Sequence, residues 1–236
     1  MNYKEKLYSA YVKSGQSRLS DIQWQKKDPY VEYVISSHIT DRTDALIVDL
    51  GCGYGKYIYR LKEKGYTNCK GVDISAEQVE AAHKAGVYEI EQGELLTFIK
   101  MQPDDIDVVL LMDIIEHLTY QEIFDLIDEV KKKLSGTGKI ILHIPNAEGI
   151  FGMRIRYGDL THEVSFTPSS INQLFNTMGF KKIFIVEDKP LIYSISSLFR
   201  RMVWEFTTLR YRLMLMAETG EKRFILSQNM LVIAEK

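Results

Sequence analysis

Acid and imidazole side chains gather in two short segments of the sequence. Asp113, Glu116 and His117 occur together in DIIEH, and His162 occurs in DLTHE. If the first segment forms a helical turn, its three polar residues share one face. A neutral histidine can remove a proton from an attacking alcohol, and the mixture of carboxylate and imidazole ligands suits Mg²⁺ or Mn²⁺. We therefore treat His117 and His162 as candidate bases and all four residues as candidate metal ligands, whereas His143, inside an apolar run, is expected to be structural.

A glycine-rich turn forms the second suggestive feature, in the segment VDLGCGYGKY. Gly51, Gly53 and Gly55 alternate directly after an apolar run, so the backbone there can pass close beneath a ligand. A dinucleotide fingerprint, G-x-G-x-x-G, would require glycine where Lys56 stands. Asp49 would repel a pyrophosphate but would attract a cationic ligand.

These chemical groups are positioned by a regular alternation of elements. Short apolar runs are typical of buried parallel strands, and amphipathic segments between them predict helices. The expected strands are 45–51, 69–74, 88–93, 105–113, 138–146, 181–188 and 223–236, and the expected helices are 56–64, 75–85, 120–134, 166–180 and 191–219. We predict an α/β, Rossmann-like, doubly wound fold with a mostly parallel seven-stranded sheet, an antiparallel edge strand and helices on both faces. Residues 1–40 are expected to form a helical cap, with Asp28 and Pro29 opening a helix, and residues 41–236 the ligand-binding domain.

Together these motifs resemble the class I S-adenosylmethionine (SAM) dependent methyltransferase family over roughly residues 40–190. VDLGCGYGKY is similar to its glycine motif, GVDIS to its ribose motif and DVVLLMDIIEHL to its fourth-strand motif. The resemblance implies that Asp49, Gly51 and Gly53 line the methionine part of SAM, Asp73 holds the ribose, Ile74 packs on adenine and Glu94 lies near its amino group. The whole implied cofactor site is Asp49, Gly51, Cys52, Gly53, Gly55, Asp73, Ile74, Glu94, Met112 and Asp113.

The acid and imidazole cluster resembles the E-x-x-E-H site, completed by a distant histidine, of small-RNA 2′-O-methyltransferases and ubiquinone-biosynthesis O-methyltransferases. Asp113 stands where those enzymes have glutamate, and its shorter side chain reaches less far. The same E-H-L sequence also occurs in methyltransferases without a metal, where it shapes the floor of the pocket. Both interpretations remain open at this point.

The second half of the chain indicates which class of acceptor the protein methylates. THEVSFTPSSINQLFNTMGF looks like methyltransferases of bacterial surface-polysaccharide synthesis, which implies a sugar hydroxyl as acceptor; a phenol or quinone acceptor and a non-catalytic SAM-binding regulatory module are the alternatives. The net charge of −2 offers no basic field for nucleic acid. Two cysteines and a polar N-terminal sequence favour a cytoplasmic protein.

The segment 191–219 has no glycine or proline and carries both an apolar stripe and four arginines, Arg200, Arg201, Arg210 and Arg212. It predicts a long helix that packs on the domain, on a second subunit in a homodimer or, at residues 191–217, on the anionic inner face of a membrane.

Overall fold

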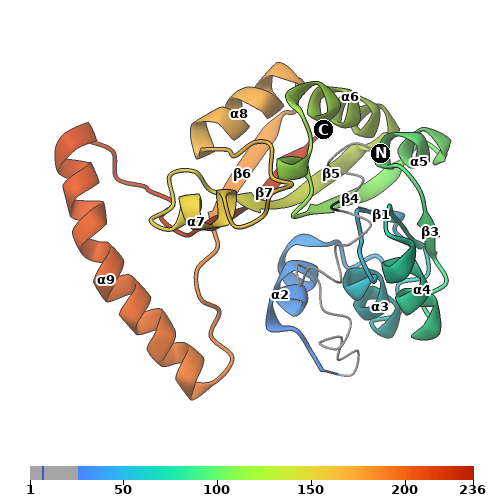
Figure 1. The fold of residues 1–236 in the computed structure, drawn as a ribbon, viewed down its shortest axis with the longest axis horizontal. Coiled ribbons are helices and arrows are strands. Elements are labelled where there is room, and N and C mark those ends of the chain that lie inside the picture. Colours follow the sequence, from blue (N-terminus) through green and yellow to red (C-terminus); the bar gives the residue numbers. More distant parts are fainter. Residues whose placement is uncertain (1–6, 8–25) are drawn as a thin grey trace.

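A seven-stranded β-sheet forms the centre of the protein, whose computed structural model describes Leu7 and residues 26–236 (Figure 1). The strand order across the sheet is β3-β2-β1-β4-β5-β7-β6. The strands are β1 (Ile47–Leu50), β2 (Cys69–Asp73), β3 (Ile90–Gln92), β4 (Ile106–Met112), β5 (Leu134–Pro145), β6 (Lys182–Glu187) and β7 (Asn229–Glu235). The order runs outward from β1 through β2 to β3 on one side, and from β4 through β5 and β7 to β6 on the other. The doubly wound sheet is thus confirmed, with its switch point between β1 and β4.

Neighbouring strands from β3 to β5 are parallel, and β7 runs antiparallel to both β5 and β6. The antiparallel pairing expected at the edge of the sheet is therefore present. The reversed strand, β7, lies one place in from the edge, between β5 and the edge strand β6.

Helices cover both faces of the sheet (Figure 1). On one face, α2 (Pro29–His38), α3 (Lys56–Glu63) and α4 (Ala76–Lys84) bury apolar side chains such as Val34, Ile58 and Val79. On the other face, α5 (Leu95–Met101), α6 (Tyr120–Lys133) and α8 (Pro168–Thr177) bury Ile99, Leu126 and others. The 3₁₀ turn η2 (Ile115–His117) follows β4, and α7 (Gly152–Arg156) and α9 (Ile195–Thr219) complete the helices of the described residues.

Helix starts match the capping signals of the sequence. Asp28 accepts a hydrogen bond from the Tyr30 amide at the start of α2, Ser75 caps α4, and Thr167 caps α8 with Pro168 in its first turn. The rest of the predicted cap, residues 1–6 and 8–25, lies outside the described residues.

Two helices, α5 and α7, are missing from the prediction, and most other elements differ from it by a few residues at their ends. Helix α5 was not predicted, because it has only 7 residues and its N-cap, Glu94, makes no side-chain capping hydrogen bond. Strand β5 starts at Leu134 instead of residue 138, and β7 starts at Asn229 instead of residue 223. Strand pairing in the sheet determines such ends, and pairing partners are not local in sequence.

Helix α9 stands apart from the sheet on the side of β6 and is joined to it by extended segments (Figure 1). Among the residues that the structure describes, no helix is both long and apolar enough to cross a membrane.

Candidate active site

The glycine turn after β1 forms a cradle that side chains would block. Gly51, Gly53 and Gly55 all have positive φ angles, of 75°, 57° and 77°. A Cβ atom on Gly51 would lie 2.0 Å from Ile114 Cδ1, far inside contact distance. The amides of Gly51 and Cys52 both donate to the Val72 carbonyl, at 2.8 and 3.0 Å, and so hold the turn against β2. The turn is therefore open on one side only, at the carboxyl ends of the strands.

Asp73, at the end of β2, braces this turn. Its carboxylate accepts hydrogen bonds from the amides of Gly53 at 2.8 Å and Ser75 at 2.9 Å. Burial raises the pKa of Asp73, while these two amides act in the opposite direction. The Gly93 amide donates to the Asp73 carbonyl at 3.0 Å, so the ends of β2 and β3 lie together. This brings exposed Ile74 and Glu94 to the same edge of the sheet, as the sequence predicted.

Asp49 lies beneath the cradle with its side chain almost fully buried. Neither carboxylate oxygen has a hydrogen-bond partner within the described part of the chain. Burial raises the pKa of Asp49 to about 7, against the opposing effect of Lys56. Because an isolated buried carboxylate is costly, this residue is suited to meet a cation. The orphaned carboxylate and the glycine cradle together fit SAM, which carries an ammonium and a sulfonium group.

An ion-paired histidine that the sequence analysis treated as structural lies beside the cradle. The two ring nitrogens of His143 contact Asp113 Oδ1 and, at 3.2 Å, Asp188 Oδ2. Burial alone would lower the pKa of His143, but the two carboxylates outweigh it and raise the pKa to about 10. His143 is therefore a cation held between two acids. The Tyr30 ring packs edge-on against it, with 5.2 Å between ring centroids.

Two tyrosines in the same region also escaped sequence analysis. Within the described residues, the buried hydroxyl groups of Tyr30 and Tyr57 have no hydrogen-bond partner. Burial, and after it the negative charges of nearby aspartates, raises the pKa of both phenols, so they remain protonated donors. Each tyrosine lies in the first turn of a helix. The sequence around it indicates only that a helix begins there, and no motif marks either residue as functional.

Glu116, His117 and His162 come together although His162 is distant in sequence. One potential ligand atom from each lies within 4.8 Å of the others. The imidazole rings meet edge-on with centroids 4.6 Å apart. The Glu116 carbonyl accepts from the amides of Glu163 and Val164 at 2.7 and 3.2 Å, which fastens the loop bearing His162 to η2.

Asp113 does not join this cluster, so the predicted set of four metal ligands is wrong in that member. Its φ of 59° and its contact with His143 direct the carboxylate elsewhere. The aspartate side chain is also too short to serve both groups. Three of the four candidate ligands remain.

Hydrogen bonds determine which nitrogen of each imidazole carries a proton. The Thr161 hydroxyl donates to Asp159 at 2.6 Å and therefore accepts from His117 Nδ1, 2.8 Å away. His162 Nδ1 donates to the Ile155 carbonyl at 3.0 Å. A ring that carries its one proton on Nδ1 has its lone pair on Nε2, so these contacts direct the lone pair of each imidazole to Nε2.

The electrostatics of the cluster favour neutral imidazole. Burial, followed by the neighbouring His162, lowers the pKa of His117 to about 4. Burial and the Asp113 charge raise the pKa of Glu116, and its Oε2 atom is buried without a partner among the described residues. An orphaned carboxylate oxygen beside two imidazole lone pairs fits a divalent cation.

Comparison with known proteins decides the family. A family model described as a methyltransferase domain matches residues 29–183. The chain belongs to this methyltransferase family. A ubiquinone biosynthesis O-methyltransferase of Rickettsia canadensis is 28% identical over 185 residues, which cover 71% of this chain and 74% of the relative.

Solved structures agree on the fold of the methyltransferase. A SAM-dependent methyltransferase from Archaeoglobus fulgidus superposes with a TM-score of 0.64 at 20% identity, and all of both chains is covered. The phosphoethanolamine N-methyltransferase 2 of Haemonchus contortus, solved with SAM, gives 0.61 at 14% identity over 88% of this chain and 52% of that one. The family match and these structures together show that the protein is a SAM-dependent methyltransferase.

Proposed function

We propose that the methyltransferase transfers the methyl group of SAM to a hydroxyl oxygen. The observation that carries this proposal is the pair of imidazoles, His117 and His162, that meet beside buried Glu116. An amine or thiolate acceptor needs no such pair, whereas a hydroxyl must lose its proton as the new bond to carbon forms. Either Nε2 atom is a suitable proton acceptor.

SAM would lie across the carboxyl ends of β1, β2 and β4. Gly51, Cys52, Gly53 and Gly55 would form the floor, with Asp49 toward the cationic methionine part and Asp73 toward the ribose. Ile74 would cover adenine, Glu94 would approach its amino group, and Met112 and Asp113 would complete the wall. When bound, SAM supplies a methyl group already activated by its sulfonium.

A divalent ion, Mg²⁺ or Mn²⁺, would be held by Glu116, His117 and His162. Such an ion supplies a positive charge that lowers the pKa of a bound hydroxyl. With three protein ligands, two neighbouring hydroxyls of one acceptor could also reach it. The chain's own contribution is to orient both imidazoles through Thr161 and the Ile155 carbonyl.

We propose a sugar hydroxyl as the acceptor, in bacterial surface-polysaccharide synthesis at the cytoplasmic face of the membrane. The resemblance of residues 161–180 to methyltransferases of that group supports it. The second candidate is a phenol with a neighbouring hydroxyl, which is favoured by the ubiquinone O-methyltransferase among the relatives. Both acceptors present adjacent oxygens.

The test measures conversion of SAM to S-adenosylhomocysteine with a panel of glycans and catechols. We expect turnover with one class, a loss of roughly 100-fold or more in His117→Ala or His162→Ala, and unchanged SAM affinity. His38→Ala is the matched control, because this histidine lies at the end of α2, where it contacts Tyr33. Wild-type turnover in both cluster variants would refute the histidine base.

Chelation distinguishes a metal-dependent mechanism from one that uses a histidine base alone. We expect activity to disappear in excess EDTA and to return with Mg²⁺ or Mn²⁺, but not in His162→Ala. Full activity in excess EDTA would refute the role of the ion, and the mechanism would then rest on a histidine base alone.

A further inference from the structure

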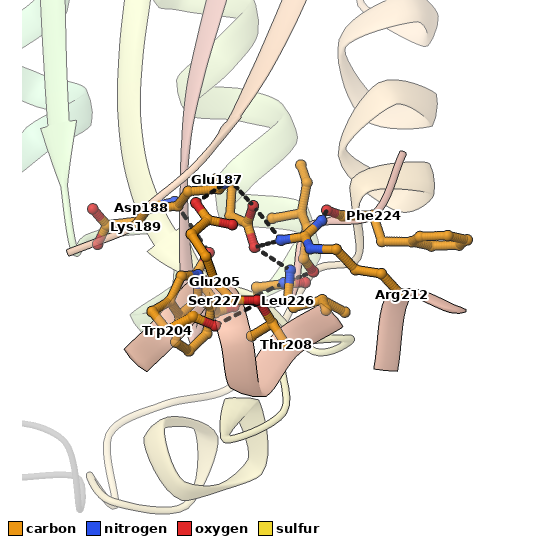
Figure 2. Close-up of polar contacts among 12 residues, drawn as sticks. Glu187, Asp188, Lys189, Trp204, Glu205, Thr208, Arg212, Phe224, Leu226 and Ser227 are labelled. Atoms are coloured by element: carbon orange, nitrogen blue, oxygen red, sulfur yellow. Dashed lines mark hydrogen bonds and ion pairs between the residues drawn. The ribbon is translucent and has the colours of Figure 1, made fainter. Parts of the chain in front are cut away.

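Helix α9 turns a mixed side toward the rest of the protein, where polar residues lie beside half-buried Trp204 and Leu215, and leaves most of its apolar side chains exposed. Of its 25 residues, only Ser197 and Thr208 are buried. Arg212 forms two hydrogen bonds to the Glu187 carboxylate, at 2.6 and 2.7 Å, and a third to the Phe224 carbonyl (Figure 2). The sequence left open whether the apolar stripe packs on the domain, on a second subunit or on a membrane; in the structure most of its side chains do not pack on the domain.

The apolar residues on the opposite side of α9 follow a heptad repeat. They are spaced alternately by four and three residues over the whole helix, and their exposed fractions range from 43% to 89%: Ile195, Phe199, Met202, Phe206, Leu209, Leu213 and Met216. We call these seven residues the α9 seam. An apolar repeat averaging 3.5 residues is the pattern by which one helix packs against another, with each side chain inserted between four of its partner.

The charges on α9 favour a protein partner over a lipid surface. Arg201 pairs with Glu205 at 2.8 Å and Arg212 pairs with Glu187, so these two arginines are neutralised on the side of the helix that faces the body. The other two arginines, Arg200 and Arg210, are exposed, which leaves α9 with only two cations outside its contacts with the body. The seam itself contains no charged residue. A helix that rests on anionic lipid instead directs its cations along the borders of its apolar face.

The size of the seam also suits a dimer. At about 100 Å² for each exposed side chain, two seams would remove on the order of 1,400 Å² from water, within the range of roughly 1,200–2,000 Å² that stable interfaces bury. Such a contact is isologous, because the same surface serves both copies.

We propose that the α9 seam is a dimer interface that packs against the α9 seam of a second copy of this chain. This inference is independent of the proposed acceptor and of the metal. It assigns to α9 a role in assembly. The contact between Arg212 and Glu187 of β6 holds the helix in position, with the α9 seam exposed to a second copy.

The test is the mass of the full chain in solution, measured by sedimentation equilibrium. We expect a dimer for the wild type and a monomer for Phe206→Glu combined with Leu213→Glu, because the interface would bury four carboxylates; self-association should weaken by a factor of roughly 100 or more. These side chains are 81% and 51% exposed within one copy, so the fold of each copy should be kept, with a circular dichroism spectrum equal to that of the wild type. Met214→Glu is the matched control: Met214 is 57% exposed on the same helix but outside the seam, and this variant should remain dimeric.

A wild-type chain that is monomeric at about 100 μM would overturn the proposal, and this result depends on no variant. A dimer that survives the double substitution would place the interface elsewhere and would also overturn it. Vesicles of phosphatidylcholine and phosphatidylserine provide the remaining comparison: a monomer that pellets with them through the seam would identify a lipid surface instead.

Discussion

At the scale of single residues, Asp49 couples ligand binding to pH. Its pKa is raised to about 7, so the free protein holds this carboxyl largely protonated at lower pH, whereas a cation in contact favours the ionised form. SAM binding should therefore release a proton, and affinity should rise up to about tenfold per pH unit from about pH 5.5 to 7. Calorimetry in two buffers of different ionisation enthalpy measures the proton count.

The same residue influences the stability of the free protein with a definite sign. Because the folded pKa lies above the ordinary value of an aspartate, stability should fall as pH rises between about 4 and 7. Asp49→Asn should weaken both pH dependences. An unchanged proton release in Asp49→Asn would show that another group titrates.

Gly51 is a position in the glycine turn where a single added carbon should be harmful. Gly51→Ala introduces a Cβ 2.0 Å from Ile114 Cδ1 on a backbone with φ of 75°. We expect a loss of roughly 1–3 kcal/mol in the free energy of unfolding, together with weaker SAM binding. Gly136→Ala is the control, since its Cβ would meet nothing within 4 Å. Urea titration measures the free energy of unfolding of both variants. Equal losses would contradict the close packing of the glycine turn at Gly51.

At the scale of elements, the ion pair between Arg212 and Glu187 fastens α9 to the end of β6. Glu187 accepts from Arg212 and, at 3.0 Å, from the Leu226 amide (Figure 2). Arg212→Met removes this pair, so local opening of α9 should cost less free energy. Hydrogen exchange and proteolysis within residues 195–219 should therefore rise by roughly tenfold. The sheet should keep its protection. Exposed Arg200, replaced by methionine, is the control, and equal loosening in both variants would exclude the anchor.

At the scale of the whole molecule, the ligand should raise the free energy of unfolding of the domain. The cradle joins β1 to β2, and Asp73 links that turn to the start of α4. S-adenosylhomocysteine at 100 times its Kd should add about 2.7 kcal/mol, or roughly 5–11 °C in Tm for a domain of this size. Asp73→Ala should lose most of this shift. A full shift in that variant would place the ligand elsewhere.

The sequence by itself determined the features that depend on neighbouring residues. The glycine turn, the carboxylates at the ends of β1 and β2, the cap of α2 at Asp28 and the continuous α9 were all predicted, and so was the doubly wound sheet. Each follows from short-range geometry: alternation of apolar runs, the left-handed backbone that glycine allows, and side chains that cap nearby amides.

Only the tertiary structure decided which side chains meet. Asp113 was assigned to the metal cluster, but it contacts His143, 30 positions away, and Asp188 completes that ion pair. His162 joins His117 only because the Glu116 carbonyl holds its loop. The stripe on α9 was legible in the sequence, yet its outward direction was not, because periodicity shows which side of a helix is apolar and never which side the rest of the chain covers.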